Sequence, residues 1–311
     1  MTLDPHVRRF LARLSLGEAR SAGALTVPGR REALQRLLSL GGEPQPVGRV
    51  AECSVPGPDG ALRLRTYTPL NAAAETPAAL LYFHGGGFVA GSLETHDGVA
   101  RALANASGCR VISVDYRLAP EARFPAAIED ACAACDWVFD HAADLGVERE
   151  RLGVSGDSAG AALAVAACRH RLAGRGPRFA VQVLLCPILD YRPGTIARRP
   201  YDQGDLLDRG TLEHDVAHYL PPRTDPADPR VSPLRAQATA DLPPACIHTA
   251  ECDPVRDDGS AYAGQLQEAG VPTRYRCHAG MIHLFYGLGM VIPHAAEAYQ
   301  TIGADIRALL A

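Results

Sequence analysis

The amino-acid sequence predicts an α/β fold in which a mostly parallel sheet of eight strands is covered by helices. From about residue 78 onward, short apolar runs alternate with longer segments of helical pattern. This order is typical of parallel sheets whose strands are connected through helices. The apolar runs are nearly continuous, which indicates strands buried on both faces. A length of 311 residues is sufficient for one large α/β domain that carries insertions.

Residues 1–45 are predicted to form one or two amphipathic helices. The apolar positions with the spacing of one helix face are Val7, Phe10, Leu11 and Leu14. A Gly- and Pro-containing break follows. Two strand-like runs, 49–55 and 62–67, then flank the turn sequence Pro-Gly-Pro-Asp-Gly-Ala. This arrangement predicts a β-hairpin at the start of the sheet.

The alternating elements of the predicted core follow in order. Strands are expected at 78–84, 110–116, 151–157, 179–189, 245–251 and 273–278. Helices are expected at 99–108, 125–146, directly after Ser158, at 256–270 and at 295–310. With the hairpin, this gives eight strands, most of which are predicted to be parallel.

Residues 191–243 interrupt this alternation. They are rich in Pro, Arg and Asp, contain no clear strand, and are too long for a plain connection in a compact domain. The part 206–220 has a helical pattern. We therefore expect N-terminal cap helices (1–45), a first part of the core (46–190), a cap insertion (191–243) and a second part of the core (244–311). The two cap segments together would form a lid.

Composition and charge exclude several classes of partner. The chain has 31 basic and 35 acidic residues, a formal net charge of −4 and no Lys/Arg-rich run. Nucleic acid and anionic membrane surfaces are therefore not expected partners. The N-terminus lacks the apolar core of a signal peptide, and no stretch approaches the roughly 20 apolar residues of a membrane span. We expect a cytoplasmic protein, in which the tripeptide Asn105-Ala-Ser107 is not a glycosylation site.

Nine cysteines are scattered through apolar runs. Their odd number and their surroundings predict buried reduced thiols rather than disulfides. Cys132 and Cys135 form a C-x-x-C in a predicted helix, but no second such pair accompanies it. We interpret them as two small residues on one helix face rather than as a redox or metal site.

The segment Gly156-Asp157-Ser158-Ala159-Gly160 stands where a predicted strand meets a predicted helix. A strand that reverses sharply into a helix leaves no room for side chains two residues before and after the turn, and glycines provide that room. The serine at the tip takes a strained backbone and projects its hydroxyl away from the sheet. The start of the helix offers free N–H groups that favour negative charge. The alternative is a Gly/Ser turn without function.

A serine hydroxyl becomes nucleophilic when a histidine, oriented by an acid, takes its proton. In this kind of fold the acid and then the histidine follow the serine along the chain. Asp253 comes just after the strand 245–251, and His283 lies in a loop after the strand 273–278. Loops at the carboxyl edge of a parallel sheet gather at one place, so we expect both side chains near Ser158.

Both assignments have rivals in the sequence. Asp253 has an alternative role as the cap of the helix that follows it, and Glu251 is a rival acid. The rival histidines are His248 inside a predicted strand, His278 at a strand end and His294 near the last helix. Position favours Asp253 and His283.

The segment His84-Gly85-Gly86-Gly87 follows the first core strand. Consecutive glycines allow the backbone to approach a ligand with its N–H groups pointing inward, as an oxyanion hole requires. A flexible turn is the alternative interpretation. The position after a strand, together with the serine turn downstream, favours the oxyanion hole.

These motifs together resemble the bacterial hormone-sensitive-lipase-like (family IV) carboxylesterases of the α/β-hydrolase fold. The residues that carry the resemblance are His84-Gly85-Gly86-Gly87, Gly156-Asp157-Ser158-Ala159-Gly160, Asp253-Pro254 and His283, with residues 115–121 (DYRLAPE) as a further match. The likeness extends from about residue 75 to the C-terminus outside the insertion. The combination is highly specific, and it implies an α/β-hydrolase fold with a helical cap.

The resemblance also implies the role of each residue. Ser158 would be the nucleophile, His283 the base and Asp253 its partner. The backbone N–H groups of Gly86, Gly87 and Ala159 would form the oxyanion hole, and His84 would hold the glycine loop. The implied reaction is hydrolysis of small esters with short or medium acyl chains, without metal or organic cofactor. The sequence departs from the family pattern at Ala161 and Leu284, where the family usually has glycine. Leu284 leaves the acyl and alcohol preference open.

Two other functions remain open at this stage. A small-molecule receptor can share the fold, but such relatives lose the base, whereas all three triad positions carry competent residues in this chain. An amidase or peptidase can use the same triad, because the triad does not recognise the leaving group. A homodimer is also left open.

Overall fold

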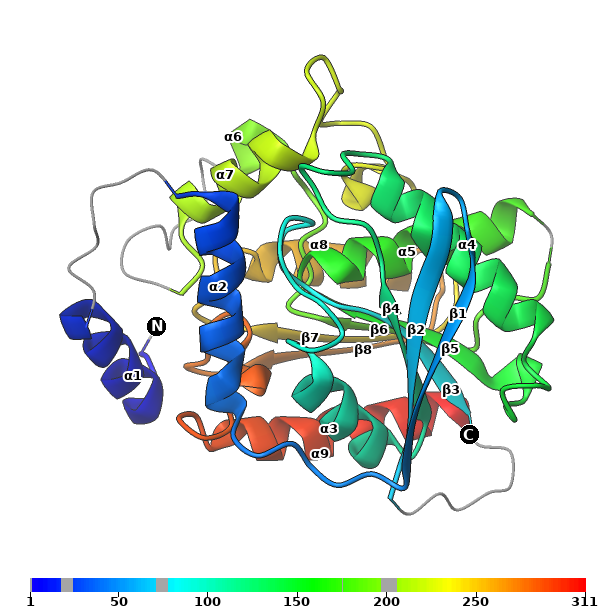
Figure 1. The fold of residues 1–311 in the computed structure, drawn as a ribbon, viewed down its shortest axis with the longest axis horizontal. Coiled ribbons are helices and arrows are strands. Elements are labelled where there is room, and N and C mark those ends of the chain that lie inside the picture. Colours follow the sequence, from blue (N-terminus) through cyan, green and yellow to red (C-terminus); the bar gives the residue numbers. More distant parts are fainter. Residues whose placement is uncertain (1, 18–24, 71–77, 175, 197–205) are drawn as a thin grey trace.

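The computed structural model describes residues 2–17, 25–70, 78–174, 176–196 and 206–311. Residues 18–24 of the predicted cap helices and 197–205 of the predicted insertion lie outside the described residues. The described chain forms one eight-stranded sheet in the order β1-β2-β4-β3-β5-β6-β7-β8, with helices on both faces (Figure 1). This is the α/β-hydrolase architecture that the sequence predicts.

The sheet is antiparallel at one edge and parallel elsewhere. The strands are β1 Arg49–Gly57, β2 Gly60–Thr68, β3 Ala79–Phe83, β4 Arg110–Asp115, β5 Leu152–Asp157, β6 Gln182–Leu185, β7 Ala245–Ala250 and β8 Thr273–His278. The hairpin β1–β2 and the pair β2–β4 are antiparallel. All five remaining neighbour pairs are parallel, so the prediction of a mostly parallel sheet is confirmed.

Helices cover the two faces of the sheet. They are α1 Pro5–Gly17, α2 Val27–Leu38, α3 Asp97–Ser107, α4 Ala126–Asp140, α5 Ala159–Ala173, α6 Pro193–Ile196, α7 Arg209–Tyr219, α8 Arg256–Glu268 and α9 His294–Leu310. Single 3₁₀ turns lie at Ser39–Gly41, Arg149–Arg151, Pro233–Arg235 and Phe285–Gly287. In Figure 1, α3 and α9 lie below the sheet, and α4, α5 and α8 lie above it.

Strand β3 shows how the sheet divides the apolar core. All five of its residues are buried. Successive side chains of a strand point to opposite faces. Ala79, Leu81 and Phe83 accordingly belong to one apolar cluster, and Leu80 and Tyr82 belong to the other. The continuous apolar run at 78–84 therefore reflects burial on both faces, as expected.

Four expectations from the sequence are wrong in detail. The strand predicted at 179–189 is only Gln182–Leu185, because Cys186 has a φ of +43° and Pro187 has no N–H for the ladder. The helix predicted to run to residue 146 ends at Asp140. Burial on both faces fails at the two edge strands, β1 and β8, each with several exposed residues. The nine cysteines are all free, but Cys277 on β8 is exposed rather than buried.

Two predicted cap segments are helical where the structure describes them. In α1, Val7 and Phe10 are buried, and Leu11 and Leu14 pack against the same apolar cluster. Helix α7 lies within the predicted insertion and begins where the Asp208 side chain accepts a hydrogen bond from the Thr211 N–H. Helices α2, α6 and α7 lie close together beyond one end of the sheet (Figure 1). None of the described helices is long and apolar enough to cross a membrane.

Two glycines allow α5 to begin against the end of β3. A β-carbon on Gly160 would overlap the backbone oxygen of Phe83, and one on Gly156 would overlap the backbone oxygen of Gly160. The steric requirement deduced from the sequence is therefore present at both positions. Ser158, midway between the two glycines, lies at the tip of this turn.

We expect Gly160→Ala to lower the free energy of unfolding by about 1–3 kcal/mol, because the added methyl group must displace backbone atoms. Urea denaturation measures this change. The matched control is Gly264→Ala in α8, where an added β-carbon meets nothing within 4 Å. That substitution is expected to stabilise the protein by up to about 1 kcal/mol. Equal effects at the two positions would contradict the packing described for Gly160.

Asp305 attaches α9 to β8. Its side chain is 2% exposed and its carboxylate accepts hydrogen bonds from Arg276 Nη2 at 3.0 Å and Arg274 Nη1 at 3.2 Å. Arg276 Nε also donates to it, and His248 Nε2 lies 3.5 Å away. Burial alone would raise the pKa of Asp305, but the interactions with His248 and Arg276 outweigh it and hold this pKa well below its usual range.

Asp305 should therefore make stability depend on pH. Because its pKa is lower in the folded protein than in the unfolded chain, its contribution is complete above about pH 4 and disappears as the pH falls through the folded-state pKa. We expect Asp305→Asn to cost about 2 kcal/mol at pH 7, with the difference from wild type shrinking below about pH 4. Urea denaturation at a series of pH values measures it. A difference that is unchanged down to pH 3 would show that the carboxylate charge is not responsible.

Candidate active site

Ser158 lies at the turn between β5 and α5. Its φ of +51° and ψ of −120° are strained for a residue with a side chain. The turn is held by its backbone, because Ser158 N donates to Leu185 O at 2.9 Å and Ser158 O accepts from Ile188 N at 3.2 Å. The residue is 6% exposed. The two hydrogen bonds to the end of β6 and the residues after it therefore hold Ser158 in the strained conformation that the sequence analysis expects at this turn.

His283 bridges Ser158 and Asp253. Its Nε2 lies 2.9 Å from Ser158 Oγ, and its Nδ1 lies 2.8 Å from Asp253 Oδ2. All three side chains are buried. A carboxylate can only accept hydrogen bonds, so Nδ1 carries the proton and Nε2 of the neutral ring is the acceptor that faces the serine hydroxyl. The three residues predicted as a triad lie in one hydrogen-bonded row.

The rival acid is engaged elsewhere. Glu251 Oε2 accepts a hydrogen bond from Gly280 N at 2.8 Å. The alternative capping role of Asp253 also has a basis, because Asp253 Oδ1 accepts from Val255 N at 2.9 Å just before α8. One carboxylate oxygen therefore fixes the local turn while the other meets His283. The two interpretations of Asp253 are compatible.

The rival histidines contact one another instead of Ser158. His248 Nδ1 lies 2.9 Å from His278 Nε2, and His278 Nδ1 lies 3.1 Å from His294 Nε2. Burial and the neighbouring His248 lower the pKa of His278 to about 3. This chain of rings belongs to the contact between β7, β8 and the start of α9. Among the described residues, His283 is the only one whose side chain forms a hydrogen bond with Ser158 Oγ.

The glycine loop after β3 has the backbone shape that an anion site requires. Gly86 and Gly87 have φ values of +123° and +66°, which side chains disfavour. The turn is closed by Val89 N and Ala90 N, which donate to Gly86 O at 3.1 and 2.9 Å. Within the described part of the chain, the N–H groups of Gly86, Gly87 and Ala159 have no acceptor. Ala159 is the first residue of α5, where such N–H groups are free.

His84 lies beneath the glycine loop and is fully buried. Burial and the neighbouring His96 lower its pKa to about 3, so the ring is neutral. Its Nδ1 donates to the carbonyl oxygen of Gly85 at 2.8 Å, and Tyr116 Oη donates to the carbonyl oxygen of His84 at 2.7 Å. His84 therefore contacts the loop, as the family resemblance implies.

Asp157 connects the glycine loop to the serine turn. Its Oδ1 accepts from Tyr82 Oη at 2.5 Å and from Gly85 N at 2.9 Å. Its Oδ2 accepts from Tyr286 Oη at 3.3 Å and lies 3.6 Å from His96 Nε2. Burial favours the neutral acid, but His96 and the hydrogen bond from Tyr82 outweigh it and lower the pKa of Asp157. These partners come from distant segments, and the sequence contains no signal for them.

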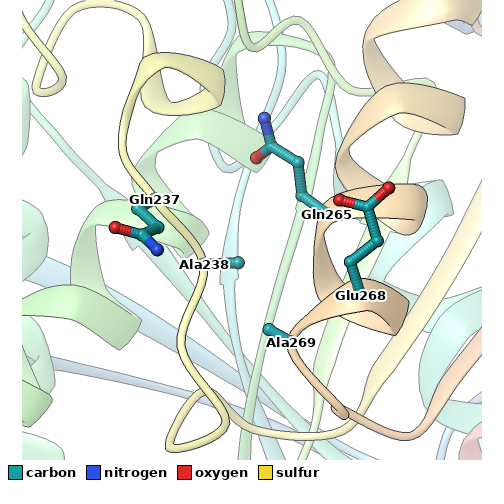
Figure 2. Close-up of a pocket in the computed structure, with 5 residues that line it drawn as sticks. All are labelled: Gln237, Ala238, Gln265, Glu268 and Ala269. Atoms are coloured by element: carbon teal, nitrogen blue, oxygen red, sulfur yellow. The ribbon is translucent and has the colours of Figure 1, made fainter.

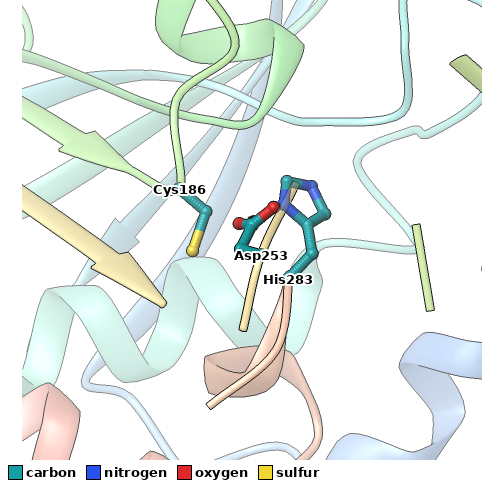
Figure 3. Close-up of side chains that lie close together, drawn as sticks. All are labelled: Cys186, Asp253 and His283. Atoms are coloured by element: carbon teal, nitrogen blue, oxygen red, sulfur yellow. Dashed lines mark hydrogen bonds and ion pairs between the residues drawn. The ribbon is translucent and has the colours of Figure 1, made fainter. Parts of the chain in front are cut away.

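Cys186 is a neighbour of the triad that the sequence analysis does not anticipate. Figure 3 shows Cys186 beside Asp253 and His283, with polar atoms of the three residues within 4.8 Å of one another. Burial, with the nearby Asp253, raises the pKa of the Cys186 thiol well above its usual range. Since metal binding requires a thiolate, this cluster is poorly suited to a metal ion. Leu284, at the position where the family usually has glycine, has a φ of +62° and is buried.

Two surface grooves lie apart from these residues. One, of about 230 Å³, is lined by Gln237, Ala238, Gln265, Glu268 and Ala269 (Figure 2). The other lies between α3 and α9. Neither contains a residue of the row formed by Ser158, His283 and Asp253.

Known proteins that are similar to this chain in sequence and fold are esterases. Ethyl acetate hydrolase of Pseudomonas putida is 37% identical over 313 residues, which is 96% of each chain. The arylesterase of Saccharolobus solfataricus is 35% identical and covers 92% of this chain and 93% of its own. Among solved structures, the hyperthermophilic esterase of the archaeon Pyrobaculum calidifontis matches with a TM-score of 0.90, 36% identity and full coverage of both chains.

The family match covers the core of the chain. A family with the alpha/beta hydrolase fold matches residues 80–287. An ester hydrolase from the metagenome of Lake Arreo has a TM-score of 0.92, 37% identity and 99% coverage of both chains. The chain therefore belongs to the α/β-hydrolase family, among the hormone-sensitive-lipase-like carboxylic ester hydrolases.

Proposed function

We propose that this chain is a serine carboxylesterase that works through an acyl-enzyme. The observation that carries the proposal is the row in which His283 meets Ser158 Oγ at 2.9 Å and Asp253 Oδ2 at 2.8 Å. The free N–H groups of Gly86, Gly87 and Ala159 lie on the loop and helix start that surround Ser158. These parts meet the requirements for nucleophile, base, orienting acid and oxyanion hole.

In the first half of the reaction, Ser158 Oγ attacks the ester carbonyl while its proton passes to His283 Nε2. The carbonyl oxygen becomes an oxyanion, which the N–H groups of Gly86, Gly87 and Ala159 stabilise. Asp253 stabilises the imidazolium that forms and holds its Nδ1–H. The C–O bond to the alcohol then breaks, the alcohol takes the proton from His283, and the acyl group remains on Ser158.

In the second half, water replaces the alcohol. His283 takes a proton from water, the resulting hydroxide attacks the acyl carbonyl, and the same N–H groups stabilise the second oxyanion. Collapse of this intermediate releases the carboxylic acid and returns the proton to Ser158 Oγ. Every proton transfer therefore passes through His283, which exchanges protons with Ser158, the alcohol and water.

We further propose small esters with short or medium acyl chains as substrates. Ser158 is 6% exposed and His283 is 7% exposed, so access to the site is narrow. The similarity to the ethyl acetate hydrolase of Pseudomonas putida and to the acetyl esterase of Salmonella agona, which is 35% identical over 254 residues, supports short acyl groups. We also propose that the chain is divided into a core and a two-part cap. The position of α2 and α7 beyond one end of the sheet supports this division (Figure 1).

Ser158→Ala is expected to abolish hydrolysis of p-nitrophenyl esters, because no other group replaces the nucleophile. The wild type and the variant are compared on acetate through palmitate esters, with circular dichroism to show that both are folded. We expect wild-type activity to be greatest on the short or medium chains. A maximum at palmitate would overturn the proposed chain length, and activity retained by the variant would overturn the role of Ser158.

Asp253→Asn is expected to reduce kcat by about 10⁴-fold, because the amide disturbs the tautomer and orientation of His283. The matched control is Glu251→Gln, which leaves the row of three intact and should change kcat by less than about threefold. Steady-state kinetics on the preferred ester measures both. The reverse ranking of the two variants would identify Glu251 as the acid.

A further inference from the structure

A buried ion pair joins the two predicted cap segments directly above the glycine loop. Arg30 lies in α2, and Asp215 lies in α7, 185 positions further along the chain. Arg30 Nε and Nη2 lie 3.2 and 3.0 Å from Asp215 Oδ2. The two side chains are only 13% and 6% exposed. An ion pair at this depth is much less screened by solvent than a surface pair.

The Asp215 carboxylate is pressed against the oxyanion loop. A β-carbon on Gly87 would overlap Asp215 Oδ2, so the carboxylate packs on the backbone of the residue whose N–H is assigned to the oxyanion hole. The ring of Tyr219, one turn further along α7, stacks on Phe88 with centroids 4.0 Å apart. Both contacts of α7 fall on the loop that follows β3. The position of Gly87 thus depends on α7.

A negative charge at this place opposes the reaction unless it is neutralised. The oxyanion of the transition state forms at the N–H groups of the loop, and a bare carboxylate beside them would repel it. Among the described residues, the charged or titratable groups that contact Asp215 are Arg30, through Oδ2, and His214, whose Nδ1 lies 3.1 Å from Oδ1. Of these two, Arg30 is the permanent cation. It is therefore the group that makes Asp215 compatible with the oxyanion hole.

We propose that Arg30 and Asp215 are positioning residues of the oxyanion hole: Asp215 packs Gly87 into place, and Arg30 cancels the charge that this packing brings beside the developing oxyanion. The proposal rests on the proposed esterase function. It makes the N-terminal segment a contributor to transition-state stabilisation, although α2 supplies no catalytic residue.

The charges predict unequal effects of the two single substitutions. Arg30→Met leaves an unpaired carboxylate beside the oxyanion, and we expect kcat to fall about 30-fold with KM changed by less than about threefold. Asp215→Asn leaves a cation there and keeps the packing on Gly87, so kcat should fall by no more than about threefold. The double variant Arg30→Met/Asp215→Asn should recover at least about tenfold in kcat over Arg30→Met.

The test combines steady-state kinetics on the preferred ester with inhibition by a trifluoromethyl ketone, which forms a tetrahedral oxyanion on the serine. The Ki of this inhibitor should rise in Arg30→Met by the same factor as the loss of kcat/KM. A pair that only anchors the cap would change KM and Tm instead. Arg36→Met is the matched control, since Arg36 also lies on α2 but forms an exposed pair with Glu32.

The outcomes separate this proposal from the proposed function. A wild type without ester hydrolysis would overturn the function itself. An active wild type in which the double variant is no better than Arg30→Met, or in which folded Asp215→Asn loses as much kcat as Arg30→Met, would overturn the positioning role alone. If Arg30→Met does not fold, Arg30→Gln, which keeps a donor to Asp215 without the charge, takes its place with about a tenfold expected loss. Without either Arg30 variant, a folded Asp215→Asn whose kcat falls well beyond the expected threefold would still overturn the positioning role.

Discussion

The close backbone contact between the end of β3 and the start of α5 is the constraint on which the candidate site depends. Gly160 has no side chain because the backbone oxygen of Phe83 occupies that space. The serine turn and the glycine loop therefore lie on adjacent parallel strands, β5 and β3, with their ends in contact. Asp157 then fastens the two together, because it belongs to the turn and accepts a hydrogen bond from Gly85 N. The proposed nucleophile and the proposed oxyanion hole are therefore joined through the backbone and Asp157, and the loop carrying His283 adds the proposed base.

The sequence predicts the strands correctly where the local apolar pattern matches the burial of the residues in the fold. Strand β3 is buried on both faces, and its unbroken apolar run was identified as a strand almost to the residue. The apolar pattern predicted strand ends or burial wrongly where the backbone departs from regular geometry, and where a strand at the edge of the sheet is open to solvent. The run at 179–189 remains apolar beyond Leu185, but the strand ends there because Cys186 turns to a positive φ. At the edge, only His278 of β8 is buried, and Cys277 is one of the exposed residues of this strand.

The residues of the candidate site were predictable because steric and chemical demands restrict them to particular residue types. Only glycine fits at position 160, and only a histidine beside an acid can serve Ser158 in this way. Contacts between residues that are far apart in the chain have no such signature in the sequence. The tyrosine that donates to Asp157 belongs to β3, and the pairing of Arg30 with Asp215 joins segments 185 positions apart. Neither partner stands in a motif, so a single sequence contains nothing that connects them.

The central claim is that Ser158 is the single nucleophile, and covalent labelling tests it most directly. The wild-type protein is incubated with a fluorophosphonate, which phosphonylates activated serines, and is then examined by intact-mass and peptide mass spectrometry. The account predicts one adduct per chain, located on Ser158, with activity lost in proportion to labelling. An adduct on another residue that accompanies the loss of activity, or full activity after Ser158 is labelled, would contradict it.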